Sequence, residues 1–178
     1  MTYDLHGSWD SVTGTLAPLY YQGHGNTQLS VDSCVRTWNE RGAPLSKISV
    51  GLGFYGHSYA GAIGLNQPHD GLDLNHWAAD DGVPQYYNIA NEIESGSMTS
   101  VFHELSQTPY AYFNNGSGFV SYENEQSICK KTDYAIENNL NGFLIWVRMQ
   151  RIQLVTALSR SHQYFFFIIL YKQLPIRS

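Results

Sequence analysis

Two segments of the chain carry apolar residues at the spacing of an amphipathic helix. Residues 31–40 (VDSCVRTWNE) have apolar side chains at positions i, i+3, i+4 and i+7, namely Val31, Cys34, Val35 and Trp38. Ser30 precedes them as a suitable N-cap, so the pattern predicts a helix here. A second helix is predicted over residues 125–138, where Ile128, Cys129, Ala135 and Ile136 fall near one face before the Asn-Leu-Asn-Gly stretch at 139–142 ends it.

Each predicted helix is followed by a short, nearly continuous apolar run. These runs, residues 47–55 (KISVGLGFY) and 143–147 (FLIWV), have the pattern of buried strands. Two helix–strand units with such strands indicate an α/β fold with a parallel sheet. Residues 57–124 are too long for an ordinary connection and must hold structure of their own, for which we predict helices at 86–94 and 98–105.

Candidate site residues lie where strands are predicted to end. Residues 1–4 (MTYD) have the pattern of the end of a further strand. Working side chains project from the carboxyl ends of parallel strands, so Tyr3, Asp4, Tyr55 and Trp146 are expected to share one face. Aromatic rings, phenol hydroxyls and a carboxylate suit a sugar. Taken singly, each residue also fits an alternative, in which Tyr55 and Trp146 are packing residues and Asp4 caps a turn.

Composition narrows the class of protein. The chain has 178 residues, with 15 acidic against 10 basic side chains and a formal charge of -5. This length predicts one domain at most. The negative charge argues against a nucleic-acid binder, which needs a basic face, and 43% hydrophobic residues argue against a disordered chain.

The charge is divided unevenly along the chain. All acidic residues lie between Asp4 and Glu137, whereas residues 148–178 hold five basic residues and neither an acid nor a glycine. This segment reads either as a basic arm or as sequence foreign to the fold. Its apolar run at 164–171 (YFFFIILY) is shorter than the about 20 residues of a membrane span, so no membrane contact is expected, and no secretory signal is seen at residues 1–4. The same run is an aggregation hazard if exposed.

Other motifs give weak signals. Cys34 and Cys129 allow one disulfide or two buried thiols, and we predict thiols. His103 and Glu104 begin a zinc-type pattern, but Gln107 stands where the second histidine is required. The seven histidines show no ligand spacing, so neither a metal nor a cofactor is expected. Asn115-Gly116-Ser117 matches the N-glycosylation acceptor pattern, which is informative only in a secreted protein.

Several motifs together carry a family resemblance. MTYDLHGSWD (1–10), APLY (17–20), VDSCVRTWNERGAPLSKISVGLGFYGHSY (31–59) and PYAYFNNGSGFVSYENEQSICKKTDYAIENNLNGFLIW (109–146) follow one another in this order. Over residues 1–147 the chain resembles the C-terminal half of glycoside hydrolase family 18 chitinases, especially those of arthropods. The resemblance implies an eight-stranded TIM barrel, of which this chain holds strands six to eight, with an α+β insertion at about 59–112.

The resemblance also implies an activity and a location. Such enzymes are extracellular and cut the β-1,4 linkages of chitin or chito-oligosaccharides without a cofactor. The N-acetyl oxygen of the substrate attacks the anomeric carbon while a glutamic acid protonates the leaving oxygen, so the scheme departs from that of paired carboxylates.

Site residues are implied at the positions that match the family motifs. Tyr3 would hydrogen-bond the N-acetyl group, and Asp4 would contact the sugar beside the scissile bond. Trp9 would line the aglycon side, and Trp146 would form the floor under the distorted sugar. Met1 and Tyr55 complete the implied substrate-binding set.

Departures from the family pattern affect the expected activity. The family's acid lies in a motif Asp-Gly-x-Asp-x-Asp-x-Glu that this sequence lacks. Residues 70–77 (DGLDLNHW) match only in part, because Asn75 and Trp77 replace the last Asp and the Glu, and we predict a loop there. His57 stands where this branch often has arginine, which puts one sugar contact in doubt.

We therefore expect the isolated chain to be inactive. A catalytically dead chitinase-like lectin and a fragment without independent function are the alternatives. The family pattern stops at Trp146, and we expect residues 148–178 to be disordered or mis-spliced sequence outside the fold.

Overall fold

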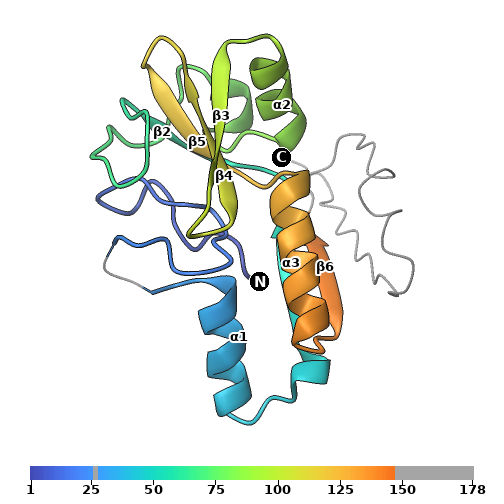
Figure 1. Cartoon of the computed structure of the whole chain (residues 1–178). Helices are drawn as coiled ribbons and strands as arrows, with labels where there is room; N and C mark the ends of the chain where they lie inside the picture. The colour runs from blue at the N-terminus through green and yellow to red at the C-terminus, as the bar shows by residue number, and fades with distance from the viewer. Residues whose placement is uncertain (26–27, 147–178) are drawn as a thin grey trace, which may run out of the picture.

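A computed structural model describes residues 1–25 and 28–146. The α-helices are α1 (Val31–Glu40), α2 (Tyr86–Glu94) and α3 (Glu125–Glu137), and the 3-10 helices are η1 (Leu45–Lys47) and η2 (Ala78–Asp80). The strands are β1 (Ser49–Gly53), β2 (His57–Ala60), β3 (Met98–His103), β4 (Thr108–Phe113), β5 (Gly118–Ser121) and β6 (Gly142–Trp146). They form two separate sheets, and Figure 1 shows β2 to β5 in the upper part of the molecule and β6 beside α3 in the lower part.

The parallel pairing expected from the two helix–strand units is confirmed. β1 pairs with β6 in a parallel sheet in which Val50 lies opposite Phe143. Helices α1 and α3 bury one stripe of side chains in a shared core with these strands, to which Val31, Val35, Ile128 and Ala135 contribute. Burial of such aliphatic side chains stabilises the fold by about 1.5–3 kcal/mol each.

Not every residue of the predicted helix faces is buried. Trp38 is 62% exposed and Ile136 is 40% exposed, so the apolar stripes are narrower than the spacing indicated. Both cysteines are free thiols, as predicted, but neither is buried, since Cys34 is half-buried and Cys129 is exposed. The helix starts follow the sequence closely, because Ser30 caps α1 in a capping box with Ser33.

The remaining strands form an antiparallel sheet with the order β2-β5-β4-β3. Helix α2 lies where the sequence predicted a helix, and Ile89 and Met98 join a second core with this sheet. The predicted helix over residues 98–105 is wrong, because residues 98–103 form the edge strand β3. A turn at 104–107 connects β3 to β4, and pairing across this hairpin overrides the local pattern.

Residues 1–4 are also not a strand in the structure. Thr2 bonds to β1 through its side chain instead of through backbone pairing. Its Oγ1 accepts from Gly51 N–H (2.8 Å) and donates to Gly51 O (3.0 Å). Asp4 then adopts a φ of 57°, in the left-handed region. This segment is held beside β1 through one side chain rather than through regular strand pairing.

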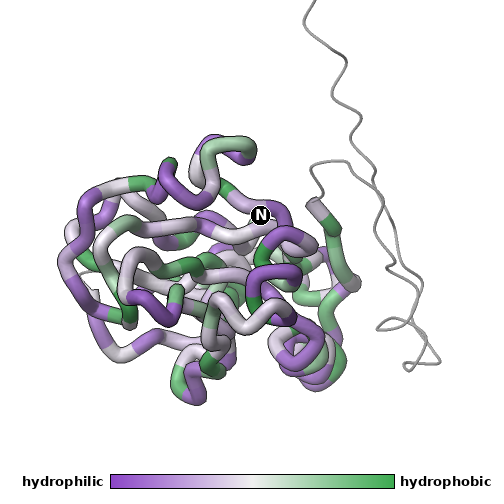
Figure 2. The backbone as a smooth tube through the Cα atoms, turned by 90° about the horizontal axis from the view of Figure 1, so that it is seen from above, coloured by the Kyte–Doolittle hydropathy of each residue, from purple (hydrophilic) through white to green (hydrophobic). Residues whose placement is uncertain are grey.

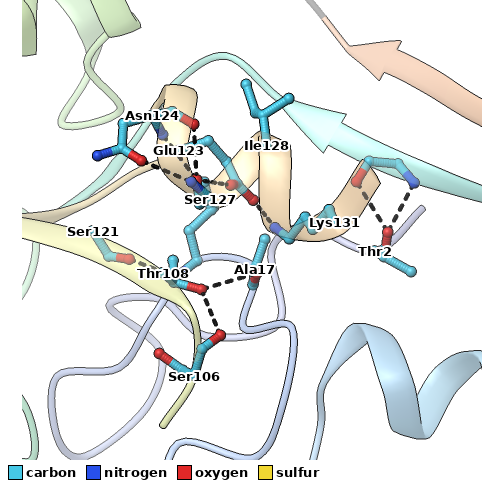
Figure 3. A network of polar contacts seen from close by, with 12 residues as sticks. Thr2, Ala17, Ser106, Thr108, Ser121, Glu123, Asn124, Ser127, Ile128 and Lys131 are labelled. Atoms are coloured by element: carbon cyan, nitrogen blue, oxygen red, sulfur yellow. Dashed lines mark hydrogen bonds and ion pairs between the residues drawn. The ribbon is translucent and has the colours of Figure 1, made fainter. Parts of the chain in front are cut away.

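A buried ion pair ties α3 to the segment before it. Lys131 Nζ contacts Glu123 Oε1, and Glu123 Oε2 also accepts from Ser127 Oγ at 2.5 Å (Figure 3). Both charged side chains are fully buried. The pair neutralises two charges that would otherwise be very costly in the interior.

Hydrophobic and hydrophilic residues alternate along the folded chain rather than gathering in one long stretch (Figure 2). Among the described residues, no helix has the length and apolarity needed to cross a membrane. The apolar run at 164–171 and the predicted disorder of 148–178 lie outside the described residues.

Candidate sugar-binding site

The structure brings the residues expected at the strand ends together. The ring of Tyr3 lies 6.1 Å from that of Tyr55 and 6.4 Å from that of Trp146, measured between centroids. The hydroxyl of Tyr55 donates to Asp4 Oδ1 at 2.5 Å. We refer to Tyr3, Asp4, Tyr55 and Trp146 as the strand-end cluster.

Backbone contacts at the ends of β1 and β6 set the positions of this cluster. Phe54 N–H donates to the carbonyl of Trp146, and Tyr55 forms an isolated antiparallel bridge with Gln85. Gly51 lets residues 2 and 3 approach the strand, because a Cβ at this position would lie 2.8 Å from Tyr3 Cε1. Tyr3 can therefore pack against β1 only because residue 51 is a glycine and has no side chain.

Asp4 is the electrostatic centre of the cluster. Its Oδ1 accepts two hydrogen bonds, one from Tyr55 Oη and one from His57 Nε2 at 2.8 Å. Burial acts to raise the pKa of Asp4, but the hydrogen bonds from His57 and Tyr55 outweigh it and the pKa is lowered. Asp4 is therefore a carboxylate at neutral pH.

The two tyrosines of the cluster stay protonated. Burial raises the pKa of Tyr55, and its hydrogen bond to Asp4 and the negative charge there raise it further. Burial and the charge of Asp4 also raise the pKa of Tyr3. Within the described residues, the Tyr3 hydroxyl is buried without a hydrogen-bond partner. The cluster thus holds a phenol donor whose hydrogen-bonding capacity a ligand could use.

His57 is a site residue whose contacts the sequence did not reveal. Its ring lies 5.1 Å from that of Trp9 at an interplanar angle of 82°, and it also contacts Tyr55 edge-on. His57 therefore connects Asp4 to Trp9. Two sequence signals pointed to this position: His57 comes two residues after Tyr55 on the same face of an extended segment, and it stands where the resembled branch often has arginine.

Trp9 and Met1 lie outside the strand-end cluster. Trp9 is 61% exposed and lines a hollow of about 420 Å³ with His6, Asp10, Gln22 and Asn66. Met1 is 86% exposed and lines a different hollow, of about 280 Å³, together with Cys34 and Trp38. The structure therefore joins Trp9 to the cluster through His57 and shows no such connection for Met1.

The weaker sequence motifs do not add a metal centre. Within residues 1–25 and 28–146, no group of three or more His, Cys, Asp or Glu side chains is placed to hold a metal ion. His103 ends β3 and Glu104 lies in a turn. Residues 70–77 form a loop, as predicted, in which Trp77 is buried in the second core.

Comparison with known proteins shows one family. The model of the glycosyl hydrolases family 18 matches residues 1–150. The chain is 32% identical to probable chitinase 10 of Drosophila melanogaster over 154 residues, which is 82% of this chain and 7% of the relative. It is 31% identical to chitotriosidase-1 of Mus musculus, covering 83% of this chain and 32% of the relative.

Solved structures agree with this result. The Ostrinia furnacalis group IV chitinase matches with a TM-score of 0.74 and 32% identity, over 82% of this chain and 42% of that chain. A mutant family 18 chitinase of Cycas revoluta in complex with (GlcNAc)4 matches with a TM-score of 0.71 and 29% identity, over 82% of this chain and 40% of that chain. The chain thus spans less than half the length of the solved chitinases that it resembles.

Proposed function

Because the chain belongs to the glycosyl hydrolases of family 18, we propose that residues 1–147 are the C-terminal part of a chitinase-type TIM barrel. In this proposal residues 1–4 end strand six, β1 is strand seven and β6 is strand eight. The parallel pairing of β1 with β6 supports this assignment. The antiparallel sheet between them supports an α+β insertion, proposed at about residues 59–112.

The proposed ligand is a chain of β-1,4-linked N-acetylglucosamine. The observation that carries this proposal is the strand-end cluster, where three aromatic rings gather beside a carboxylate. Trp146 is 38% exposed and offers a flat apolar face on which a pyranose ring can stack. The matched Cycas revoluta structure in complex with (GlcNAc)4 supports the choice of ligand.

Each residue of the cluster has a proposed role. The unpartnered hydroxyl of Tyr3 donates to the N-acetyl carbonyl and holds it for attack on the anomeric carbon. The carboxylate of Asp4 accepts from the acetamide N–H or a sugar hydroxyl, and Tyr55 fixes the orientation of that carboxylate. Trp9 extends the binding surface on the aglycon side, whereas Met1, which lines a separate hollow, is given no role.

Proton donation to the leaving oxygen needs an acid that these residues do not supply. The sequence contains no Asp-Gly-x-Asp-x-Asp-x-Glu motif, and both tyrosines near the proposed cleavage point have raised pKa values. The 178-residue chain therefore binds chito-oligosaccharide without cleaving it. A catalytically dead chitinase-like lectin fits the same cluster, since Trp9 and Trp146 remain exposed for stacking. The proposed site of action is extracellular, as the family resemblance implies.

Two assays separate these outcomes. The purified chain is incubated with chitin beads and with a fluorogenic chito-oligosaccharide. We expect retention on the beads, weakened by Asp4→Asn and Trp146→Ala, together with no release of the fluorophore. Release at the rate of a full-length family 18 chitinase would refute the inactivity, and absence of retention would refute the binding.

A further inference from the structure

The turn between β4 and β5 contains the single Asn-x-Ser/Thr tripeptide of the sequence, Asn115-Gly116-Ser117. Asn115 and Gly116 are exposed, and Ser117 is half-buried. An asparagine that accepts a glycan has to lie on the surface, because the attached oligosaccharide is bulky and polar. The structure therefore places this tripeptide where a folded chain has room for the modification.

Hydrogen bonds fix the backbone of this turn. Gly116 N–H donates to the carbonyl of Phe113 at 2.9 Å, so residues 113–116 form a β-turn with Asn115 at its third position. Gly116 has a φ of 79°, a left-handed conformation that glycine adopts without strain. The turn thus presents the side chain of Asn115 at the end of the β4–β5 hairpin.

The side chains of Asn115 and Ser117 contact each other within the turn. Ser117 Oγ donates to Asn115 Oδ1 at 2.5 Å, and Ser117 N–H donates to the same oxygen at 3.1 Å. Both hydrogen bonds use Oδ1, so neither engages Nδ2. Loss of a proton from Nδ2 places negative charge on Oδ1, and hydrogen bonds to that oxygen favour the deprotonated form. The serine therefore assists bond formation at Nδ2.

A neighbouring histidine also holds the serine in place. Ser117 Oγ lies 3.1 Å from His76 Nε2, and the ring of His76 stacks on that of Phe113 with centroids 3.9 Å apart. Because the stacked ring is fixed against β4, it limits the rotation of the Ser117 side chain. The hydroxyl therefore stays next to Asn115.

The turn lies at the far end of β5 from the strand-end cluster. β5 begins at Gly118, directly after the turn, and ends at Ser121, which pairs with His57 of β2. His57 in turn contacts Asp4 of the cluster. Three residue steps of about 3.4 Å each separate the two ends of β5, so a group attached to Asn115 leaves the cluster open.

We propose that Asn115 is the acceptor of an N-linked oligosaccharide, transferred from a lipid pyrophosphate carrier. Asn115 Nδ2 attacks the anomeric carbon of the first sugar, and the bond from this carbon to the pyrophosphate oxygen breaks. Nδ2 gives one proton to a base of the transferase, and the lipid pyrophosphate leaves. The proposal rests on the extracellular site of action proposed above, because this transfer takes place in the secretory pathway.

The test directs the full chain into the secretory pathway of cultured mammalian cells with a cleavable leader. Removal of the leader reports that the chain has entered the pathway, and only this fraction, from cells and medium together, is scored. A peptide-N-glycosidase in heavy-oxygen water converts a glycosylated asparagine into a labelled aspartate, which spontaneous loss of the amide beforehand does not mimic. Peptide mass spectrometry then locates the label, which we expect at position 115 in most of the chain.

Substitutions in the turn separate the acceptor from its surroundings. Asn115→Gln and Ser117→Ala should lose the glycan completely, whereas Ser117→Thr keeps a hydroxyl at this position and should retain it. Asn114→Gln is the matched control, since Asn114 is exposed in the same turn but has Gly116 two positions further on. The glycan should remain in this control.

An unlabelled position 115 in the leader-free chain would overturn the proposal, as would label that persists in Ser117→Ala. Retention on chitin beads, measured on the same material, keeps this result apart from the proposed sugar binding. Chain that is retained but unlabelled would overturn the acceptor site alone. Chain that is labelled but not retained would support the acceptor site and refute the binding.

Discussion

The residue that organises the strand-end cluster is Asp4, because two donors converge on one of its oxygens. Its pKa is lowered by these hydrogen bonds against the effect of burial. Asp4 therefore stabilises the folded chain above its unfolded pKa of about 3.9, and this contribution is lost as the pH falls through the lowered folded-state value.

Tyr55→Phe should raise the pKa of Asp4, since it removes one of these donors and leaves the carboxylate equally buried. The change is measured by NMR titration of the Asp4 carboxyl carbon. Tyr59→Phe is the matched control, because Tyr59 Oη bonds the carbonyl of Gly14 and not Asp4. An Asp4 pKa that is unchanged in Tyr55→Phe would contradict the assigned role of Tyr55.

The location of the cluster could be predicted from the sequence, but its connections could not. Tyr55 and Trp146 lie at the ends of recognisable apolar runs, and parallel strand ends meet at one edge. Tyr3 and Asp4 were placed there by a strand end expected at residues 1–4, which the structure does not form. The bond from His57 to Asp4 depends on the positive φ of Asp4, a conformation that nothing in residues 1–4 signals. The contact between His57 and Trp9 likewise depends on the path of the intervening loops.

At the scale of elements, the local pattern of apolar residues predicted α1, α2, α3 and β1, but it did not predict β3. Met98, Val101, Phe102 and Leu105 have helical spacing, yet residues 98–103 pair with β4. The strand lies at the edge of its sheet and only Met98 is buried, so no alternation marked it as a strand. The pairing of this segment with β4, rather than its own apolar spacing, decided its structure.

The N-cap of α1 offers a test of local stability. Ser30→Ala removes the side-chain acceptor for Ser33 N–H and should lower the free energy of unfolding by about 0.5–2 kcal/mol. Urea denaturation followed by circular dichroism measures the change. Ser46→Ala, at an exposed serine of η1, should have almost no effect, and an equal loss in both variants would argue against the cap.

The buried pair of Lys131 and Glu123 gives a larger effect. Burial lowers the pKa of Lys131, and removal of one partner leaves a buried charge without compensation. Lys131→Met should therefore destabilise the chain by about 3–5 kcal/mol, while the double variant Lys131→Met with Glu123→Leu should recover most of this loss. Denaturant unfolding of both variants measures the coupling, and simple additivity of the two losses would contradict it.

At the scale of the whole molecule, the parallel sheet has two strands within residues 1–25 and 28–146. Among the described residues, β1 and β6 pair with each other and with no further strand. Unpaired strand edges are templates for pairing with another chain, and a two-stranded sheet is marginal by itself. In the proposed barrel the unpaired edges of β1 and β6 face neighbouring strands, since every strand of a closed barrel has a neighbour on each side.

We expect the isolated chain to self-associate at micromolar concentration through these edges. Leu144→Lys places a charge on β6 and should shift the population toward monomer, as measured by light scattering after size exclusion. Ile63→Lys, which changes an apolar residue that is 46% exposed outside both sheets, is the control. A monodisperse monomer in the unmodified chain would show that the edges are already protected.

Calorimetric titration with the N-acetylglucosamine tetramer tests the central claim most directly, when the mixture is also analysed for products by mass spectrometry. We expect the tetramer to bind saturably to the unmodified chain and to the control variant Trp38→Ala. Its affinity for Trp146→Ala should be at least tenfold weaker, which corresponds to a loss of about 1.4 kcal/mol in binding free energy. The tetramer should remain intact in every mixture. Absence of binding to the unmodified chain, equal affinity in Trp146→Ala, or the appearance of shorter oligosaccharides would contradict the account.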